Sequence, residues 1–423
     1  MNILLLGSGG RENAISWKLK QSPLCDNLYI APGNAGTAAF GTNVPLSVTD
    51  FAGIKQFCLD NNIHILFPGG EDSLVAGIYD FFKHNHELKH IIVAGPSKEG
   101  AQLEGSKAFA KEFMMRHHIP TAAYREFNDA NFEEGVQYLK EQTLPIVLKA
   151  DGLAAGKGVV IAESTQEAID AFTLMIKDAQ FGEASKRVVV EQFLTGIELS
   201  VFVMSDGTHY VRLPEAKDYK RIGEGDTGPN TGGMGAISPV PFADPGFMQK
   251  IIDRVIDPTV NGLKKEDIVY HGFIFFGLIN VGGDPYVIEY NCRMGDPETE
   301  VVMPRLKNDL VELIIKMDRG VLNEVVMSHD TKAACTVMLV SEGYPGDYPK
   351  GRIMTGFEQT EGSLLFHAGT AQMGSEVITN GGRVLAVTSY GKDIKEALEM
   401  SYKNAELINY EGKYFRKDIG YEF

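Results

Sequence analysis

The stretch of sequence that decides the fold is Ile146–Ala162, which reads IVLKADGLAAGKGVVIA. Two apolar runs, Ile146–Ala150 and Val159–Ala162, flank a loop that holds three glycines and a lysine. The loop does not fit the Walker A pattern, because its glycine spacing is one residue short and a strand follows it instead of a helix. A Gly-rich loop between two strands can fold over nucleotide phosphates as a lid, and Lys149 can reach phosphate oxygens as a point charge. The stretch therefore predicts a nucleotide site closed by a strand–loop–strand lid.

The first hundred residues alternate strand and helix signals. Asn2–Leu6 predicts a buried strand, and a Gly turn then leads into an amphipathic helix from Arg11 to Lys20. Further strands are predicted at Leu28–Ala31, Ile63–Phe67 and Ile91–Ala94, with helices at Ile54–Asn61 and near Leu74–Lys83. Alternating strands and helices joined by short turns predict a parallel sheet with helices on both faces.

Three Gly-containing loops follow the strands of this predicted sheet. They are Gly7–Arg11, Pro32–Gly36 and Gly69–Glu71. The carboxyl ends of parallel strands share one edge, where α/β folds bind ligands. A dinucleotide site is disfavoured, because Glu12 replaces the third glycine of GxGxxG and no acidic residue ends the second strand. A single phosphate at the turn fits better, and a tight turn without a ligand is the alternative.

A second polar cluster follows a predicted hairpin formed by Phe273–Val281 and Tyr286–Tyr290. Glu289 and Asn291 lie two positions apart, so their side chains point to the same face of a strand. A carboxylate and an amide oxygen on one face suit Mg²⁺, and a solvent-facing polar edge is the alternative. Arg293 follows and can bind a phosphate or a carboxylate with two hydrogen bonds.

Two further segments complete the organisation. Arg221–Gly235, RIGEGDTGPNTGGMG, is a long Gly-rich polar loop, and loops of this length inside a domain are usually functional or disordered. After about Val325 the pattern changes. Strands near Ala334–Val340 and Val384–Ser389 and a helix near Ile394–Leu407 predict a smaller α+β unit.

Composition limits the class of protein. The chain has 423 residues and a formal net charge of -16, so a nucleic-acid partner, which would require a basic surface, is not expected. No apolar run approaches the ~20 residues of a membrane span, and no signal peptide is recognised at the first residues. Four cysteines without a CxxC pair argue against a disulfide framework and against a structural zinc site. We therefore predict a protein of the cytoplasm with no membrane partner.

Taken together, the motifs are recognisable over nearly the whole chain. They are GSGGREN, APGNAGT, QLEGSKAF, VLKADGLAAGKGVV, DTGPNTGGMGA, VIEYNCRMGDPETE, FHAGT and NGGRVL. The chain resembles the phosphoribosylamine–glycine ligase family of the ATP-grasp superfamily. The resemblance implies an α/β and α+β fold with a Rossmann-like N-terminal domain at 1–102. It also implies an ATP-grasp core at 103–325, with a mobile lid at about 121–190, and a small C-terminal α+β domain at 326–423.

The resemblance also implies an activity. Members of this family join glycine to phosphoribosylamine through glycyl phosphate, with ATP and Mg²⁺ or Mn²⁺, in purine biosynthesis. The expected partners are therefore glycine, phosphoribosylamine and ATP, and we expect a monomer.

Site residues carried over from the family fall into three sets. The ATP set is Lys107, Lys149, Gly156, Lys157, Gly158, Glu191, Gln192, Phe193, Leu194 and Glu198. The substrate set is Gly9, Gly10, Arg11, Asn34, Ala35, Gly36 and Glu71 for phosphoribosylamine, with Asp218, Arg293 and Asp296 for glycine. The metal set is Glu289 and Asn291, and Lys149, Arg293 and Asp296 are the predicted catalytic residues.

Two departures from the family pattern concern these sets. Gly70 stands where the family has proline in the loop after the third strand, and Phe273–Val281 holds no acidic metal ligand. We therefore expect Mg²⁺ to rest on few protein ligands and on phosphate oxygens.

The competing interpretations belong to three classes. Another ATP-grasp ligase, such as a biotin carboxylase-type enzyme or a carboxyaminoimidazole ribonucleotide synthetase, would share the ATP site and differ in the Gly-rich loops. An NAD-dependent oxidoreductase would need the dinucleotide fingerprint, which is incomplete. A catalytically dead ATP-binding regulator would not need the intact set of Lys107, Lys149, Glu289 and Asn291.

Overall fold

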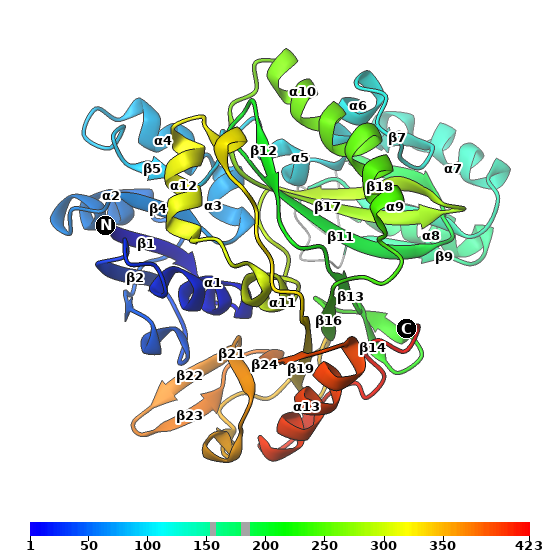
Figure 1. The fold of residues 1–423 in the computed structure, drawn as a ribbon. Helices are drawn as coiled ribbons and strands as arrows, with labels where there is room; N and C mark the ends of the chain where they lie inside the picture. The colour runs from blue at the N-terminus through cyan, green and yellow to red at the C-terminus, as the bar shows by residue number, and fades with distance from the viewer. Residues whose placement is uncertain (153–157, 179–186) are drawn as a thin grey trace.

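The computed structural model describes residues 1–152, 158–178 and 187–423, and it shows a mixed α/β architecture (Figure 1). The strands form a parallel N-terminal sheet, a central antiparallel sheet, a smaller antiparallel sheet and a C-terminal sheet. No helix in the described part of the chain has the length and apolar character that crossing a membrane requires.

The N-terminal sheet is parallel throughout, as predicted. Its strands are β1 (Asn2–Gly7), β2 (Asn27–Pro32), β3 (Thr42–Asn43), β4 (Ile65–Pro68) and β5 (Ile92–Val93), in the spatial order β3-β2-β1-β4-β5. From β1 the chain forms β2 and β3 on one side of this strand. It then crosses over and forms β4 and β5 on the other side of β1. The carboxyl ends of β1 and β4 therefore form the switch point at which such sheets bind ligands.

Helices of this domain differ from the predicted ones in two respects. They are α1 (Gly10–Lys20), α2 (Phe51–Asp60), α3 (Glu71–Ala76) and α4 (Ile78–His84). The helix predicted near Leu74–Lys83 is divided, because Gly77 adopts a φ of 93°. The predicted amphipathic helix is buried on most sides, because α1 packs against α11 (Thr299–Arg305) and β21 (Ser363–His367) as well as its own sheet.

The lid body is a four-stranded antiparallel sheet in the order β7-β10-β8-β9. Its elements are β7 (Tyr124–Asn128), α7 (Phe132–Glu141), β8 (Ile146–Ala150), β9 (Val159–Ala162), α8 (Thr165–Ile176) and β10 (Arg187–Gln192). Ser164 caps α8 by accepting a hydrogen bond from the backbone N–H of Glu167. The helices cover the sheet around Phe127 and Phe172 and give the lid a core of its own.

The central sheet has the order β12-β11-β17-β18. Its strands are β11 (Ile197–Ser205), β12 (Tyr210–Arg212), β17 (Tyr270–Val281) and β18 (Asp284–Asn291), and β6 (Gly95–Pro96) pairs with the start of β17. Helices around it are α5 (Gln102–Gly105), α6 (Lys107–Arg116), α9 (Pro245–Ile251), α10 (Asp257–Lys265) and α12 (Leu310–Asp318). The predicted hairpin β17–β18 is present, and β11 and β12 form a second hairpin.

The C-terminal sheet combines strands from two distant parts of the chain. Its order is β13-β16-β19-β24-β21, with β13 (Lys217–Asp218), β16 (Gly235–Ser238), β19 (Ala333–Ser341) and β24 (Arg383–Gly391). The predicted loop Arg221–Gly235 lies between β13 and β16 and contains a short hairpin of β14 (Arg221–Gly223) and β15 (Thr227–Asn230). Helix α13 (Ile394–Leu407) covers the sheet, as Figure 1 shows in red. Smaller strands are β20 (Ile353–Met354), β22 (Thr370–Met373), β23 (Glu376–Thr379) and β25 (Lys413–Tyr414).

Candidate active site

A cavity of about 390 Å³ lies in the C-terminal domain, and a second cavity of about 290 Å³ lies at the switch point of the N-terminal sheet. The second is lined by the Gly-rich turn after β1, the start of α3 and the side chain of Asp296. It brings together four residues predicted for substrates: Gly9, Arg11, Glu71 and Asp296. The turn also lies at the N-terminus of α1, and this end of a helix favours an anion.

Glu12 explains why this turn lacks the dinucleotide pattern. Its Oε2 accepts the backbone N–H of Gly9 at 2.6 Å, and its Oε1 accepts Arg11 Nε at 2.6 Å. The Glu12 side chain packs so closely under the turn that a Cβ at Gly7 would lie 2.4 Å from Glu12 Cγ. The carboxylate therefore caps α1 and orients the Arg11 guanidinium towards the pocket mouth, where Met294 O accepts from it at 3.2 Å.

Asn34 joins this turn to the C-terminal domain. Its Nδ2 donates to Ser8 O at 2.9 Å and to His367 O at 2.7 Å, and its Oδ1 accepts from Gly36 N at 2.9 Å. A Cβ at Gly36 would lie 2.6 Å from the His367 ring. Asn34, Ala35 and Gly36 therefore support the pocket from behind and are not part of its lining. Their direct contact with phosphoribosylamine stays a prediction.

We expect Asn34→Ala to destabilise the fold by about 3 kcal/mol, because it leaves several buried backbone groups without partners. The turn after β1 should also shift, raising the KM for phosphoribosylamine, the substrate predicted for this cavity, while the KM for the predicted nucleotide ATP stays unchanged. Chemical denaturation and initial rates measure the two effects. Asn27→Ala is the matched control, since Asn27 is exposed and bonds only to Asn2 in the described chain. An unchanged phosphoribosylamine KM in a destabilised Asn34→Ala would limit Asn34 to a structural role.

Arg293 is held between two carboxylates from different helices. Its Nε lies 2.9 Å from Glu71 Oε2, and its Nη2 lies 2.5 Å from Glu104 Oε1. Burial opposes ionisation of Glu71, but Arg293 and Arg11 hold the pKa of its carboxyl at about 2. Burial raises the pKa of Glu104 despite the same arginine. The guanidinium therefore ties the end of β18 to α3 and α5, with its charge beside the cavity at the switch point.

Asp296 is oriented by the C-terminal domain. Arg383 Nη2 lies 3.0 Å from Asp296 Oδ1, and Arg383 Nη1 donates to Asp296 O at 2.8 Å. Glu300 is fully buried nearby, and burial followed by the charge of Asp296 raises the pKa of its carboxyl. Arg383 and Glu300 were not among the predicted site residues, although the motifs NGGRVL and GDPETE contain them.

Among the residues predicted to bind ATP, Glu191 pairs with two buried lysines. Lys149 Nζ lies 3.0 Å from Glu191 Oε1 and donates to Ile288 O at 3.2 Å, while Lys111 Nζ lies 3.1 Å from Glu191 Oε2. Burial lowers the pKa of Lys111 to about 8, and Glu191 counteracts the shift. Lys111 was missed by the sequence analysis, because no motif quoted from the chain contains it.

The other residues predicted to bind ATP lie around Glu191 and its two lysines. Lys107 Nζ donates to Gly152 O at 2.8 Å, and Gly158 O accepts from Ala150 N at 2.8 Å, so both contact the lid hairpin. Gln192 ends β10, and Phe193 and Leu194 follow it in the link to β11. The predictions for Gly156 and Lys157 lie outside the described residues.

Glu198, Asp218 and Glu289 converge on Lys220. Lys220 Nζ lies 2.6 Å from Glu198 Oε2. Burial lowers the pKa of the Lys220 ammonium, but the three carboxylates together raise it well above its ordinary value. Burial and the neighbouring Asp218 raise the pKa of Glu298 to about 7. The structure thus brings the predicted ribose, glycine and metal residues together, and it adds Lys220, which the sequence analysis missed.

A β-bulge in β18 turns Glu289 and Asn291 towards this cluster. Val287 pairs with Leu278 and Glu289 with Gly277, so Ile288 is an extra residue in the ladder. Before the bulge the buried residues of the strand are 285 and 287, and after it they are 290 and 292. Because the alternation shifts by one residue, Glu289 is exposed and Asn291 is half-buried on the same face. Their oxygen donors suit Mg²⁺. Among the described residues, no group of three or more His, Cys, Asp or Glu side chains has the geometry of a metal site.

Comparison with known proteins agrees with this arrangement. Models of the phosphoribosylglycinamide synthetase N domain, ATP-grasp (A) domain and C domain match residues 1–104, 105–299 and 334–422. The chain belongs to the phosphoribosylglycinamide synthetase family. A relative from Haemophilus influenzae, named phosphoribosylamine–glycine ligase, is 48% identical over 100% of this chain and 98% of its own length.

Solved structures place this phosphoribosylglycinamide synthetase family member among ATP-grasp proteins. The crystal structure of phosphoribosylamine–glycine ligase from Thermotoga maritima has a TM-score of 0.86 and 37% identity, covering 99% of this chain and 100% of that one. The biotin carboxylase domain of Hydrogenobacter thermophilus 2-oxoglutarate carboxylase has a TM-score of 0.73 and 18% identity, covering 97% and 91%. The second likeness concerns the fold alone. The predicted family and fold class are therefore confirmed.

Proposed function

We propose that this chain joins glycine to phosphoribosylamine, converting ATP to ADP and phosphate and giving glycinamide ribonucleotide for purine biosynthesis. The observation that carries the proposal is the match over the whole chain to ligases of that name. The geometry supports it, because the switch-point pocket and the lysine–carboxylate cluster are joined by the segment that holds Arg293 and Asp296.

The reaction needs two displacements. A carboxylate oxygen of glycine attacks the γ-phosphorus of ATP, the bond to the bridging oxygen breaks, and glycyl phosphate and ADP form. The amine of phosphoribosylamine then attacks the carbonyl carbon, phosphate leaves with the C–O bonding electrons, and the amine loses a proton. Positioning and charge stabilisation are the main tasks of the protein, so no nucleophilic side chain is needed.

Lysines and backbone groups are proposed to bind ATP. Lys107 and Lys149 lie at the base of the lid hairpin, where their ammonium groups would neutralise phosphate charge. Because both oxygens of Glu191 face lysines, we assign the reading of adenine to the backbone of residues 191–194. Glu198 would accept the ribose hydroxyls after exchanging Lys220 as its partner.

The two other substrates are proposed to meet between Arg293 and Asp296. Phosphoribosylamine would place its phosphate at Gly9, Gly10 and Arg11, with Glu71 on the opposite wall of the cavity. Glycine would offer its carboxylate to Arg293 and its ammonium to Asp218 or Asp296. These proposed contacts would bring the amine of one substrate beside the carboxylate of the other.

Glu289 and Asn291 would hold Mg²⁺ or Mn²⁺ through oxygen atoms on one face of β18. A divalent ion at this position would neutralise charge on the ATP phosphates during transfer. Exposure of Glu289 leaves its carboxylate free to take a hard cation, because in the described structure no salt bridge joins it to a lysine or arginine.

We expect Glu289→Gln to raise the Mg²⁺ concentration for half-maximal ADP formation about tenfold, because an amide binds a hard cation more weakly than a carboxylate. Titration of the initial rate with Mg²⁺ measures the shift. Glu324→Gln, outside the site, is the control. An unchanged Mg²⁺ requirement in Glu289→Gln would remove this residue from the metal site.

The proposed function is tested by following ADP release from ATP and Mg²⁺ with glycine and freshly made phosphoribosylamine omitted in turn. We expect release to require both, with glycinamide ribonucleotide detected by mass. Release with another acid or amine would reassign the substrates. Bound ATP without release under every combination would favour a regulator.

Domain limits are proposed as 1–102, 103–325 and 326–423, with the lid at about 121–190. Support comes from the bounds of the family models and from the separate core of the lid sheet. We also propose a monomer that works in the cytoplasm, where nucleotide synthesis supplies its substrates. Sedimentation equilibrium of the purified chain tests the monomer.

A further inference from the structure

Residues 217–235 form a segment that we name the substrate loop, and it has contacts to the C-terminal domain and, through Lys220, to Glu198. Side chains alternate at its start, where Lys217 and Tyr219 are buried while Asp218 and Lys220 are half-buried and lie close to Glu198 and Glu289. Whatever fixes Lys217 and Tyr219 therefore sets the position of Asp218 and Lys220 in the candidate active site.

Glu422 holds both buried residues with one carboxylate. Its Oε1 lies 2.9 Å from Lys217 Nζ, and its Oε2 accepts from Tyr219 Oη at 2.7 Å. Lys217 Nζ also lies 4.1 Å from the centroid of the Tyr219 ring. Lys217 Nζ also donates to Asp218 O at 3.4 Å. Since a strand residue between two fixed neighbours has little freedom, these contacts restrain Asp218.

Arg416 restrains the next part of the substrate loop. Its side chain is fully buried, and Nη1 donates to Arg221 O at 3.1 Å and to Asp226 Oδ1 at 2.7 Å. Asp418 binds the same guanidinium at 2.8 Å through each of its oxygens and accepts from Gly225 N at 2.7 Å. Tyr421 Oη donates to Asp226 Oδ2 at 3.0 Å, which closes the network.

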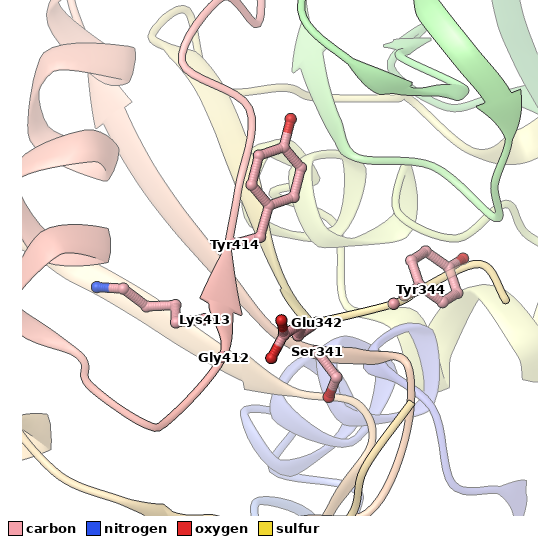
Figure 2. Close-up of a pocket in the computed structure, with 7 residues that line it drawn as sticks. Ser341, Glu342, Tyr344, Gly412, Lys413 and Tyr414 are labelled. Atoms are coloured by element: carbon pink, nitrogen blue, oxygen red, sulfur yellow. The ribbon is translucent and has the colours of Figure 1, made fainter. Parts of the chain in front are cut away.

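Two tyrosines fix the backbone of the loop beside the larger cavity. Tyr414 Oη donates to Ile222 O at 3.0 Å, and Tyr344 Oη accepts from Gly232 N at 2.9 Å. Figure 2 shows both tyrosines at this cavity, with Tyr414 and Lys413 projecting to different sides of their strand. The two tyrosine hydroxyls at this cavity thus anchor the substrate loop.

We propose that Tyr414, Arg416, Asp418, Tyr421 and Glu422, which we name the C-terminal clamp, are positioning residues that hold Asp218 and Lys220 for the reaction of glycine. The inference rests on the proposed function, since it takes Asp218 to bind glycine. The clamp touches neither substrate, so its effect reaches the reaction through the geometry of the substrate loop.

Glu422→Ala tests the clamp, with Tyr219→Phe as a milder variant that removes only a hydroxyl. We expect the KM for glycine to rise about tenfold in Glu422→Ala, because the partner of a buried ammonium is lost, while the KM for ATP stays within about twofold. Hydrogen exchange of the amides in 217–235 should become faster. Lys417→Ala is the matched control. The Lys417 side chain lies in the same C-terminal segment as the clamp, is exposed, and pairs with Glu406.

Five outcomes separate the possibilities. Faster exchange with a higher glycine KM supports the clamp. Faster exchange with unchanged kinetics, or an equal rise in the KM for glycine and ATP, overturns it as a positioning element. Unchanged exchange in both Glu422→Ala and Tyr219→Phe also overturns it. If the unaltered protein forms no glycinamide ribonucleotide, the proposed function is contradicted instead. Hydrogen exchange in the variants then tests the clamp independently of that function.

Discussion

Lys149→Met should lower kcat for ADP formation about a hundredfold to a thousandfold, the cost found when one preorganised donor to transition-state charge is removed. Lys149 is the predicted phosphate ligand whose ammonium lies between Glu191 and Ile288 O at the base of the lid hairpin. Met keeps the length and the apolar packing of the stem while removing the charge. Initial rates at saturating ATP and glycine measure the loss.

The surroundings of Lys149 decide how this result is interpreted. In Lys149→Met the Glu191 carboxylate keeps Lys111 as its partner, so the fold should survive. Lys140→Met on the exposed face of α7 is the matched control and should keep full activity. A folded Lys149→Met that retains its rate would show that the ammonium does not act on the phosphates and that its role is to neutralise Glu191.

Arg293→Met should abolish most activity and destabilise the fold by about 3–5 kcal/mol, because breaking a buried ion pair leaves an uncompensated charge. Glu71 and Glu104 would both lose the guanidinium that joins α3 and α5 to the end of β18. Denaturant unfolding and the glycine dependence of the rate measure the two losses. Arg254→Met is the control, because its pair with Asp284 is on the surface.

A second substitution separates stability from activity at this position. Glu104→Gln combined with Arg293→Met should recover part of the lost stability, because it removes the deeper of the two unpaired carboxylates. The rate should stay low if Arg293 also binds glycine or the acyl phosphate. Recovery of both properties in the double variant would mean that Arg293 only supports the structure.

The same ion pair gives stability a defined pH dependence. The folded pKa of Glu71 is about 2, below its ordinary value of 4.5, so the pair stabilises the fold above pH 4.5. This stabilisation, on the order of 3 kcal/mol, is lost as the pH falls from 4.5 towards 2. Arg293→Met should lack this part of the acid transition, because Glu71 then returns towards its ordinary pKa.

Much of the fold followed from local sequence signals. The parallel N-terminal sheet was predicted from apolar runs and Gly turns, and α13 was predicted with its observed bounds. Local signals failed where packing from a distance decides. The pattern of α1 does not reveal that α11 and β21 cover it, and the break at Gly77 depends on a backbone conformation that the apolar spacing does not encode.

The site was predicted less completely than the fold. Motifs identified Arg11, Glu71, Arg293 and Asp296, which the structure gathers around one cavity. Lys111 and Lys220 were missed, because a single lysine in a sequence is most often on the surface. Their importance depends on the carboxylates that surround them: Glu191 on β10 beside Lys111, and Glu198 on β11 and Glu289 on β18 beside Lys220.

By itself, the sequence determined the family, the class of reaction and the position of the Gly-rich loops, because each depends on the order of residues over short spans. Tertiary structure alone decided that a bulge at Ile288 turns Glu289 and Asn291 into the site, since register depends on the partner strand. It also decided that Glu422 and Arg416 restrain the loop of Asp218, because long-range contacts between charged groups leave no periodic signal in the chain.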